Sequence, residues 1–299
     1  MDNATLGSWS ITDSMPGKGA CLLNELSVLE VTGADAAHFL HGQFTNHINN
    51  INDHFRLAAY CQPQGRVLAL MRVAKVDDTF YLVLPKDLVS GFVKRLSMFI
   101  LRSDVKIFVA DRLAVCGLID CDCKLSEIGH ILIDRDCIIA RTPDWDNKKR
   151  ALAIGAKETL DRIFKPNQTS ALWFESEIET GTPWIFEKTR EAFIPQWINL
   201  DLIGGLVFDK GCYPGQEVIS RVQHIGSTPR RMVLATSEAA VPCFPNDEVF
   251  QNGQSVGNVV MSVKTERQTM SLIEVTIKSM EIGKYQIKDV EFSVKALSF

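Results

Sequence analysis

The sequence predicts an α+β protein with mixed antiparallel sheets, three subdomains and a small C-terminal β-barrel. The chain has 299 residues, and at ~100–200 residues per domain this length suggests two or three domains. Before residue 231, hairpin-like neighbouring strands outnumber strand–helix–strand crossovers. After Arg231 only short β-type runs follow, which favours a separate barrel. We therefore expect subdomains over residues 1–110, 111–230 and 231–299.

Hydrophobic periodicity predicts the elements of the first subdomain. Residues 22–31 have the composition of a strand, and the turn at Thr32–Asp35 can start a helix. From Ala36 onward, apolar residues recur at i, i+3 and i+4, which indicates one buried helix face. A further helix of about three turns follows Pro85. Three more strands are predicted over 66–75, 79–84 and 105–110.

The rest of the chain divides into a mixed region and a region of strands alone. The mixed region is predicted to hold strands over 113–119, 130–140 and 150–155, then a helix over roughly 156–165. The strand-only region has β-type runs over 232–236, 247–250, 256–263, 270–278 and 289–296, with Asn252-Gly253 as a turn.

Composition and charge exclude several classes of protein. The chain has 32 Lys and Arg against 36 Asp and Glu, and its 46% of hydrophobic residues is near the globular average, which disfavours disordered and collagen-like classes. The net charge of −4 disfavours a general nucleic-acid-binding surface. No segment approaches the ~18–20 apolar residues of a membrane span, and the first residues lack signal-peptide features. We expect a cytoplasmic protein with no membrane partner.

The eight cysteines are scattered along the chain, mostly in apolar surroundings, as free thiols are in a reducing compartment. Cys121 and Cys123 form the one tight pair in the sequence. No second pair or nearby histidine at zinc-finger spacing accompanies them, so we predict ordinary thiols and no metal site.

The most unusual segment is Lys-Gly-Cys-Tyr-Pro-Gly-Gln-Glu, from Lys210 to Glu217. Its glycines permit positive φ angles and close approach of the backbone to a ligand. Pro214 suits the first turn of a helix, which predicts that Cys212 lies at a helix start. A helix N-terminus and the Lys210 ammonium both favour a thiolate, so Cys212 is the candidate reactive or ligand-binding sulfur. Gln216 and Glu217 are candidates to orient a ligand or to cap backbone donors. The alternative is a tight loop-to-helix junction in which Cys212 is packed.

This segment resembles the Lys-Gly-Cys-Tyr-x-Gly-Gln-Glu signature of the YgfZ-type folate-binding proteins, which belong with the glycine-cleavage T-protein (aminomethyltransferase) superfamily. Supporting matches follow in order along most of the chain: Thr32-Gly33-Ala34-Asp35, Gly42-Gln43-x-Thr45, Cys61-x-x-x-Gly65-Arg66, Ile178-Glu179-x-Gly181-x-Pro183, Phe193-Ile194-Pro195-Gln196, Arg221, Gly226 and Arg230. The resemblance implies an aminomethyltransferase-like folate-binding fold, with three subdomains around a central opening.

The resemblance also implies a function. Members of this family are linked to assembly or repair of iron–sulfur clusters and, through iron–sulfur enzymes, to tRNA modification such as methylthiolation. It implies tetrahydrofolate, or a one-carbon derivative of it, as cofactor, and iron–sulfur enzymes or cluster-assembly proteins as partners. The family's essential-looking cysteine falls on Cys212, and its lysine partner falls on Lys210.

The resemblance further implies which residues line the folate site. Two aromatic positions of the relatives fall on Leu26 and Trp173. An indole can stack on a pterin or benzoyl ring, whereas the aliphatic Leu26 lacks this interaction. The alternative for Trp173 is plain core packing. Glu179 matches the superfamily glutamate expected to hydrogen-bond the pterin amino group. The other expected folate-binding residues are Tyr213, Gln216, Glu217, Arg221 and Arg230, of which the arginines suit the anionic glutamyl tail.

Two departures from the superfamily pattern bear on the reaction. The acidic residue that acts on folate in true aminomethyltransferases is replaced by the stretch Asn46-His47, and the arginine expected two residues before Glu179 is Glu177. We therefore expect no ordinary aminomethyl transfer, and whether the protein turns over a substrate stays open. One alternative is a folate-dependent one-carbon transferase. Another is direct tRNA binding through the basic residues Arg221, His224, Arg230 and Arg231, which the acidic net charge disfavours.

Overall fold

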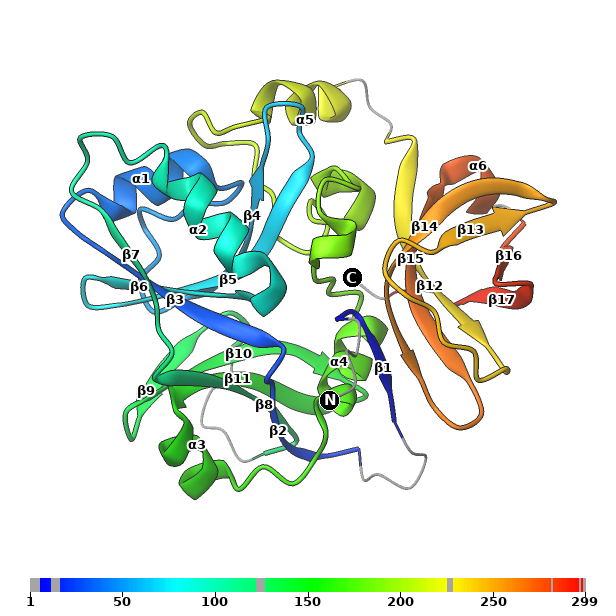
Figure 1. Cartoon of the computed structure of the whole chain (residues 1–299), viewed down its shortest axis with the longest axis horizontal. Coiled ribbons are helices and arrows are strands. Elements are labelled where there is room, and N and C mark those ends of the chain that lie inside the picture. Colours follow the sequence, from blue (N-terminus) through cyan, green and yellow to red (C-terminus); the bar gives the residue numbers. More distant parts are fainter. Residues whose placement is uncertain are drawn as a thin grey trace.

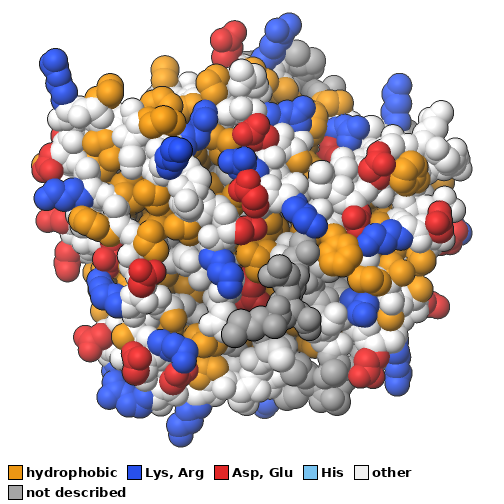
Figure 2. Space-filling model, viewed as in Figure 1, with side chains coloured by type: hydrophobic (Ala, Val, Ile, Leu, Met, Phe, Trp, Pro, Cys, Tyr) orange, Lys and Arg blue, Asp and Glu red, His pale blue; other side chains and the backbone are white. Residues whose placement is uncertain are grey.

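The computed structural model describes residues 6–11, 17–121, 127–224, 228–280, 282–295 and 297, with His224 described in its backbone only. The described strands form three sheets, and the helix α4 (Ser170–Glu179) lies between the second sheet and the barrel (Figure 1). The predicted α+β class with a C-terminal barrel is confirmed. Figure 2 shows basic and acidic side chains interspersed over one face, without an extended area of one sign.

The first sheet is antiparallel, in the order β4-β5-β6-β3-β7, and two helices accompany it. Its second strand, β5, is almost entirely buried, because its run of apolar residues is covered on both faces. Asp77, in the tight turn after β5, has a φ of 51°. The bounds are β3 (Leu26–Thr32), α1 (Ala36–Gln43), β4 (Phe55–Cys61), β5 (Val67–Val76), β6 (Thr79–Pro85), the 3-10 turn η1 (Lys86–Leu88), α2 (Val89–Ser97) and β7 (Lys106–Val109).

The second sheet is also antiparallel, in the order β2-β8-β11-β10-β9. The single strand predicted over 130–140 is two strands, because Arg135 and Asp136 both take positive φ angles and form a tight turn. β2 lies in the segment predicted to belong to the first subdomain, yet it pairs with β8. The bounds are β2 (Gly19–Leu22), β8 (Leu113–Ile119), β9 (Ile131–Asp134), β10 (Cys137–Trp145), β11 (Lys148–Ala156) and the helix α3 (Lys157–Phe164).

The third sheet is a closed barrel, since the order β14-β13-β16-β17-β12-β15 returns to β14 through a β14–β15 pairing. At Gly257 a Cβ atom would lie 1.8 Å from the Glu274 carbonyl oxygen, so this close strand approach requires glycine. The bounds are β12 (Arg230–Ser237), β13 (Glu248–Gln251), β14 (Gln254–Lys264), β15 (Thr269–Thr276), the helix α6 (Ile277–Met280), β16 (Lys284–Ile287) and β17 (Val290–Lys295).

A strand from near the start of the chain extends the barrel sheet. β1 (Ser8–Ser10) runs parallel to β14, with Ser8 paired to Ser262. The Trp9 ring stacks on Phe174 of α4, with centroids 3.8 Å apart and planes inclined by 10°. This strand therefore connects the barrel with the centre of the molecule, although the sequence places it in the first subdomain.

The remaining segments lie between the three sheets. α4 is buried on nearly all sides, so it lacks the polar face by which an amphipathic helix is recognised, and the sequence pattern does not predict it. The other elements are the helix α5 (Gln216–His224) and the 3-10 turns η2 (Glu187–Thr189) and η3 (Pro195–Ile198). No helix in the described ranges has the length and apolar character that a bilayer span requires.

Candidate functional site

The signature segment is fixed to the end of α1 by Lys210. Its ammonium donates hydrogen bonds to the carbonyl oxygens of His41, at 2.5 Å, and of Phe44. These carbonyls belong to the last turn of α1 and its cap, where backbone acceptors lack helical partners and the helix dipole favours a cation. Burial lowers the pKa of Lys210 to about 8. Lys210 thus joins two segments that are far apart in sequence.

Cys212 lies before the helix rather than at its start. Pro214 and Gly215 form a turn, and α5 begins at Gln216, so the prediction that Cys212 occupies the helix start is wrong. Because the dipole effect is confined to the first turn, it does not extend to a residue four positions upstream. The thiol is nevertheless exposed. The close approach predicted at the glycines occurs between loops: a Cβ atom on Gly215 would lie 2.6 Å from the Gln62 carbonyl oxygen.

The other signature residues have different environments. Tyr213 is buried with the Lys210 ammonium 4.9 Å from its ring centroid, and burial raises the pKa of its hydroxyl. Gln216 donates to the Lys210 carbonyl at 3.4 Å, which closes the loop on itself. Glu217 and Arg221 point to solvent on α5.

Arg230 belongs to the barrel rather than to the signature loop. Its Nη1 donates to both carboxylate oxygens of Glu274, at 2.9 and 3.0 Å, and its guanidinium lies 5.4 Å from the centroid of the Trp197 ring. The neighbouring Arg231 pairs with Asp201 through two nitrogens, Nη1 to Oδ1 at 2.6 Å and Nη2 to Oδ2 at 2.8 Å. Of the predicted basic patch, His224 has no described side chain.

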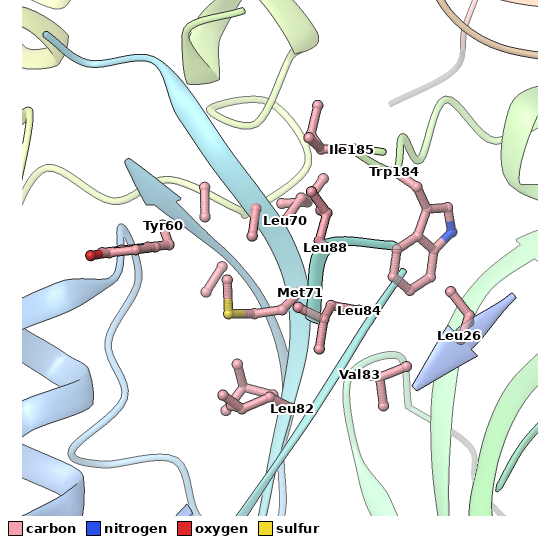
Figure 3. Packing of buried hydrophobic residues seen from close by; sticks show 14 of the residues in the cluster. Leu26, Tyr60, Leu70, Met71, Leu82, Val83, Leu84, Leu88, Trp184 and Ile185 are labelled. Carbon is pink, nitrogen blue, oxygen red and sulfur yellow. The ribbon is translucent and has the colours of Figure 1, made fainter. Parts of the chain in front are cut away.

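The three residues expected to line the folate site, Leu26, Trp173 and Glu179, are absent from the lining of the best-formed cavity in the described part of the chain. Trp173 is fully buried and packs on Gly117, where a Cβ atom would lie 2.4 Å from the indole. Leu26 is buried in the same core as Trp184 (Figure 3). Glu179 accepts a hydrogen bond from the Trp145 indole at 2.8 Å and lies 3.5 Å from the Lys295 ammonium.

A cavity of about 640 Å³ lies where the first sheet, the second sheet and the loop at 202–207 meet. It is lined by apolar side chains from β4 and the loop, including Phe55, Leu57 and Ile203, and by a few polar groups. The polar side chains include Asn46, His47, Arg56, Arg72, Arg141, Thr142, Glu177, Thr180 and Thr182. None of the signature residues 210–217 lines it.

Glu177, on the wall of this cavity, accepts hydrogen bonds from three other side chains. It is 1% exposed and accepts hydrogen bonds from Arg72, from Arg150 at 3.0 Å and from the Trp184 indole at 2.9 Å. The Arg72 guanidinium also lies 3.4 Å from the centroid of the Trp184 ring. Two buried guanidinium groups thus share one carboxylate, and their charges are only partly compensated.

Three residues that line the cavity each have one buried polar atom without a hydrogen-bond partner among the described residues. These atoms are Nη1 of Arg72, Nε of Arg141 and Oγ1 of Thr142. Most buried polar groups in proteins are hydrogen-bonded, so three exceptions in one cavity wall mark it as a place for a ligand.

The cavity and the signature loop are connected by His47. It lines the cavity, and its Nε2 lies 3.1 Å from the Asp209 carboxylate, one residue before Lys210. The hydrogen bond to His47 lowers the pKa of Asp209. The Asn46 amide donates to the carbonyls of Leu57 and Gly204, at 2.8 and 2.7 Å. An amide in that position cannot exchange a proton as a carboxylate does.

Sequence reasoning missed the arginines of the cavity wall. One signal was available, since Arg72 interrupts the apolar run Leu70-Met71-Arg72-Val73, and a charged residue inside a buried strand points to a paired or functional group. In the sequence, Glu177 stands out only as a departure from the family pattern. No group of three or more His, Cys, Asp or Glu that could hold a metal occurs within the described ranges; Cys123, of the predicted thiol pair, lies outside them.

The architecture matches that of a solved structure. The crystal structure of the glycine cleavage system aminomethyltransferase T from Bartonella henselae matches 94% of this chain and 85% of its own chain, with a TM-score of 0.71 and 12% identity. The chain therefore has the aminomethyltransferase-like fold that the sequence predicts.

Particular relatives are found among the proteins called "tRNA-modifying protein YgfZ". The one from Colwellia psychrerythraea is 26% identical over 250 residues, which cover 77% of this chain and 74% of the relative. The one from Buchnera aphidicola is 29% identical over 235 residues, which cover 74% of each. No protein-family model matches the chain. The resemblance predicted from the Lys210–Glu217 signature is thus confirmed.

Proposed function

We propose that this protein has a YgfZ-type role in tRNA modification and that it binds tetrahydrofolate in the central cavity. The observation that carries the proposal is the cavity with its unpartnered polar atoms, in a fold shared with a T-protein and a sequence similar to YgfZ proteins. The role in tRNA modification is exerted through iron–sulfur enzymes or cluster-assembly proteins, whose clusters the protein helps to build or repair.

The residues of the cavity suit a folate. Its volume of about 640 Å³ falls within the range of ~300–1,000 Å³ typical of small-molecule sites. Phe55 and Leu57 offer apolar surface for a flat ring. Arg56, Arg72 and Arg141 outnumber the single carboxylate Glu177 on the wall, which favours an anionic ligand. When bound, tetrahydrofolate would supply a one-carbon carrier, and the protein would orient it and exclude water.

Calorimetric titration with tetrahydrofolate tests the binding, using a variant that fills the cavity. Ile203→Trp places a bulky ring in the space beside Gly204 and is expected to weaken binding at least tenfold. Ile277→Trp is the matched control, because Ile277 is an exposed residue on α6, away from the cavity wall. Wild-type protein that binds no tetrahydrofolate at millimolar concentration would contradict the folate part of the proposal.

Cys212 is the residue we propose to act on the iron–sulfur side of the function. It is the exposed cysteine among the described ones, and it lies on the loop that Lys210 fixes to α1. A Cys212→Ala variant should fold with unchanged stability, because the thiol is exposed, but should fail to restore tRNA methylthiolation in a strain that lacks the protein. Cys121→Ala is the control. Full restoration by Cys212→Ala would remove the cysteine from the mechanism.

A further inference from the structure

We propose that Arg72, Arg141 and Thr142 form a carboxylate-binding subsite on the wall of the central cavity, so that the cavity selects its ligand by an anionic group. The subsite rests on the proposed folate binding and deepens it, because it assigns a specific recognition role to three residues that the family signature does not contain.

The unpartnered atoms are the first argument. Arg72, Arg141 and Thr142 are 3%, 2% and 5% exposed, so each side chain has lost most of its contact with water. Each still has one polar atom with no partner in the described part of the chain. A buried donor without a partner is destabilising, and small shifts of these side chains toward an acceptor in the cavity would relieve this cost.

The charge of the wall is the second argument. Arg72 and Arg150 share the single carboxylate of Glu177, which leaves one positive charge in a buried network. Burial lowers the pKa of Arg72 to about 10, so the guanidinium remains charged at neutral pH. Arg141 is paired with Asp144. A neutral acceptor would satisfy the hydrogen bonds, whereas a carboxylate would also balance the excess charge.

Both guanidinium groups are already held in place, which is the third argument. Arg72 is fixed by Glu177 through Nη2 and by the Trp184 ring. Arg141 is fixed through Nη1 and Nη2 by the carbonyls of Thr142 and Arg150 and by Asp144. The unused donors are Nη1 of the first and Nε of the second. Little side-chain freedom is then lost on binding, and the small rotamer adjustments that usually accompany binding bring an acceptor within reach.

The test compares two ligands that differ in charge but keep the same ring system. Tetrahydrofolate carries two glutamate carboxylates, and in its dimethyl ester both are blocked. If a carboxylate occupies the subsite, the ester should bind at least tenfold more weakly in calorimetric titration.

Thr142→Val is the sharpest variant, because it keeps the side-chain shape and removes a hydroxyl that has no partner in the described structure. It should melt no lower than wild type, yet bind tetrahydrofolate about threefold to tenfold more weakly and bind the ester without change. Arg72→Gln should bind tetrahydrofolate at least tenfold more weakly, and should bind the dimethyl ester without change. Its melting temperature reports any damage to the Glu177 network.

The outcomes separate this inference from the proposed function. Binding of tetrahydrofolate that is equalled by the ester, and that Thr142→Val leaves unchanged, overturns the subsite while folate binding stands. Equal weakening of acid and ester by the variants shows a neutral ring oxygen at these donors and overturns the carboxylate assignment. Absence of any tetrahydrofolate binding to the wild type overturns both proposals.

Discussion

At the scale of single residues, two glutamates of α4 occupy opposite environments. Glu177 is 1% exposed and accepts hydrogen bonds from two arginines and a tryptophan, whereas the side chain of Glu179 is partly exposed and contacts Trp145 and Lys295. The sequence pattern predicts a functional role for Glu179, because it matches the superfamily glutamate. A helix turns by about 100° per residue, so Glu177, two residues earlier, points to a different side of α4, where it lines the cavity.

Replacing each glutamate by glutamine should separate these environments. Glu177→Gln removes the negative charge that compensates Arg72 and Arg150, and we expect it to lower the free energy of unfolding by about 3 kcal/mol. Glu179→Gln weakens a partly exposed ion pair and should cost less than about 1 kcal/mol. Urea unfolding measures both. Equal losses of unfolding free energy in the two variants would mean that the buried Glu177 network contributes no more to stability than a surface ion pair.

At the scale of elements, regular periodicity decides what can be predicted. The strand predicted over 113–119 has the same bounds as β8, and α3 differs by one residue at each end from its predicted range. In contrast, β1 and β16 are too short to show a pattern, and α4 lacks a polar face because it is buried nearly all round. α4 carries Glu177, so the part of the cavity wall that this helix supplies was missed together with the helix.

The contact between α1 and the signature loop predicts a particular pH dependence. The unfolded chain keeps the Lys210 proton up to about pH 10.5, whereas the folded protein releases it near pH 8. Between these values the unfolded state binds more protons, so the contribution of Lys210 to the free energy of unfolding rises with pH.

The comparison with Lys210→Met isolates this contribution. From pH 8 to about 10, urea unfolding should show wild type gaining stability relative to the variant, while the other titrating groups, common to both proteins, cancel. A difference between the two that stays constant over this range would show that the ammonium keeps its ordinary pKa.

At the scale of the whole molecule, the cavity forms only when distant parts of the chain come together in the fold. Its wall takes side chains from the first sheet, the second sheet, α4 and the loop at 202–207, so no local pattern identifies it. The signature at Lys210–Glu217 can be recognised in the sequence because its residues are contiguous. Arg72 and Arg141 of the cavity wall come from β5 and β10, and only the tertiary structure brings them together.

Packing between the barrel and the centre predicts that Trp9 stabilises the whole chain. Trp9→Ala removes the stack on Phe174 and the indole hydrogen bond to Glu25, and should cost about 3 kcal/mol. Phe108→Ala, at a side chain 51% exposed on β7, is the control and should change stability by about 0.5 kcal/mol or less. Thermal unfolding of the two variants measures the difference. A Trp9 variant as stable as the control would show that β1 is dispensable.

The pairing of β1 with β14 also sets an order of events during synthesis. Ser8 is synthesised about 250 residues before its partner Ser262, so β1 remains unpaired until β14 is made. At ~5–20 residues per second, that interval lasts roughly 12–50 seconds. During this time the strand that carries Trp9 lacks its pairing partner β14, and its unpaired backbone is open to binding by a chaperone or a neighbouring chain. The unpaired state of β1 therefore ends only when β14 is made and the barrel is completed.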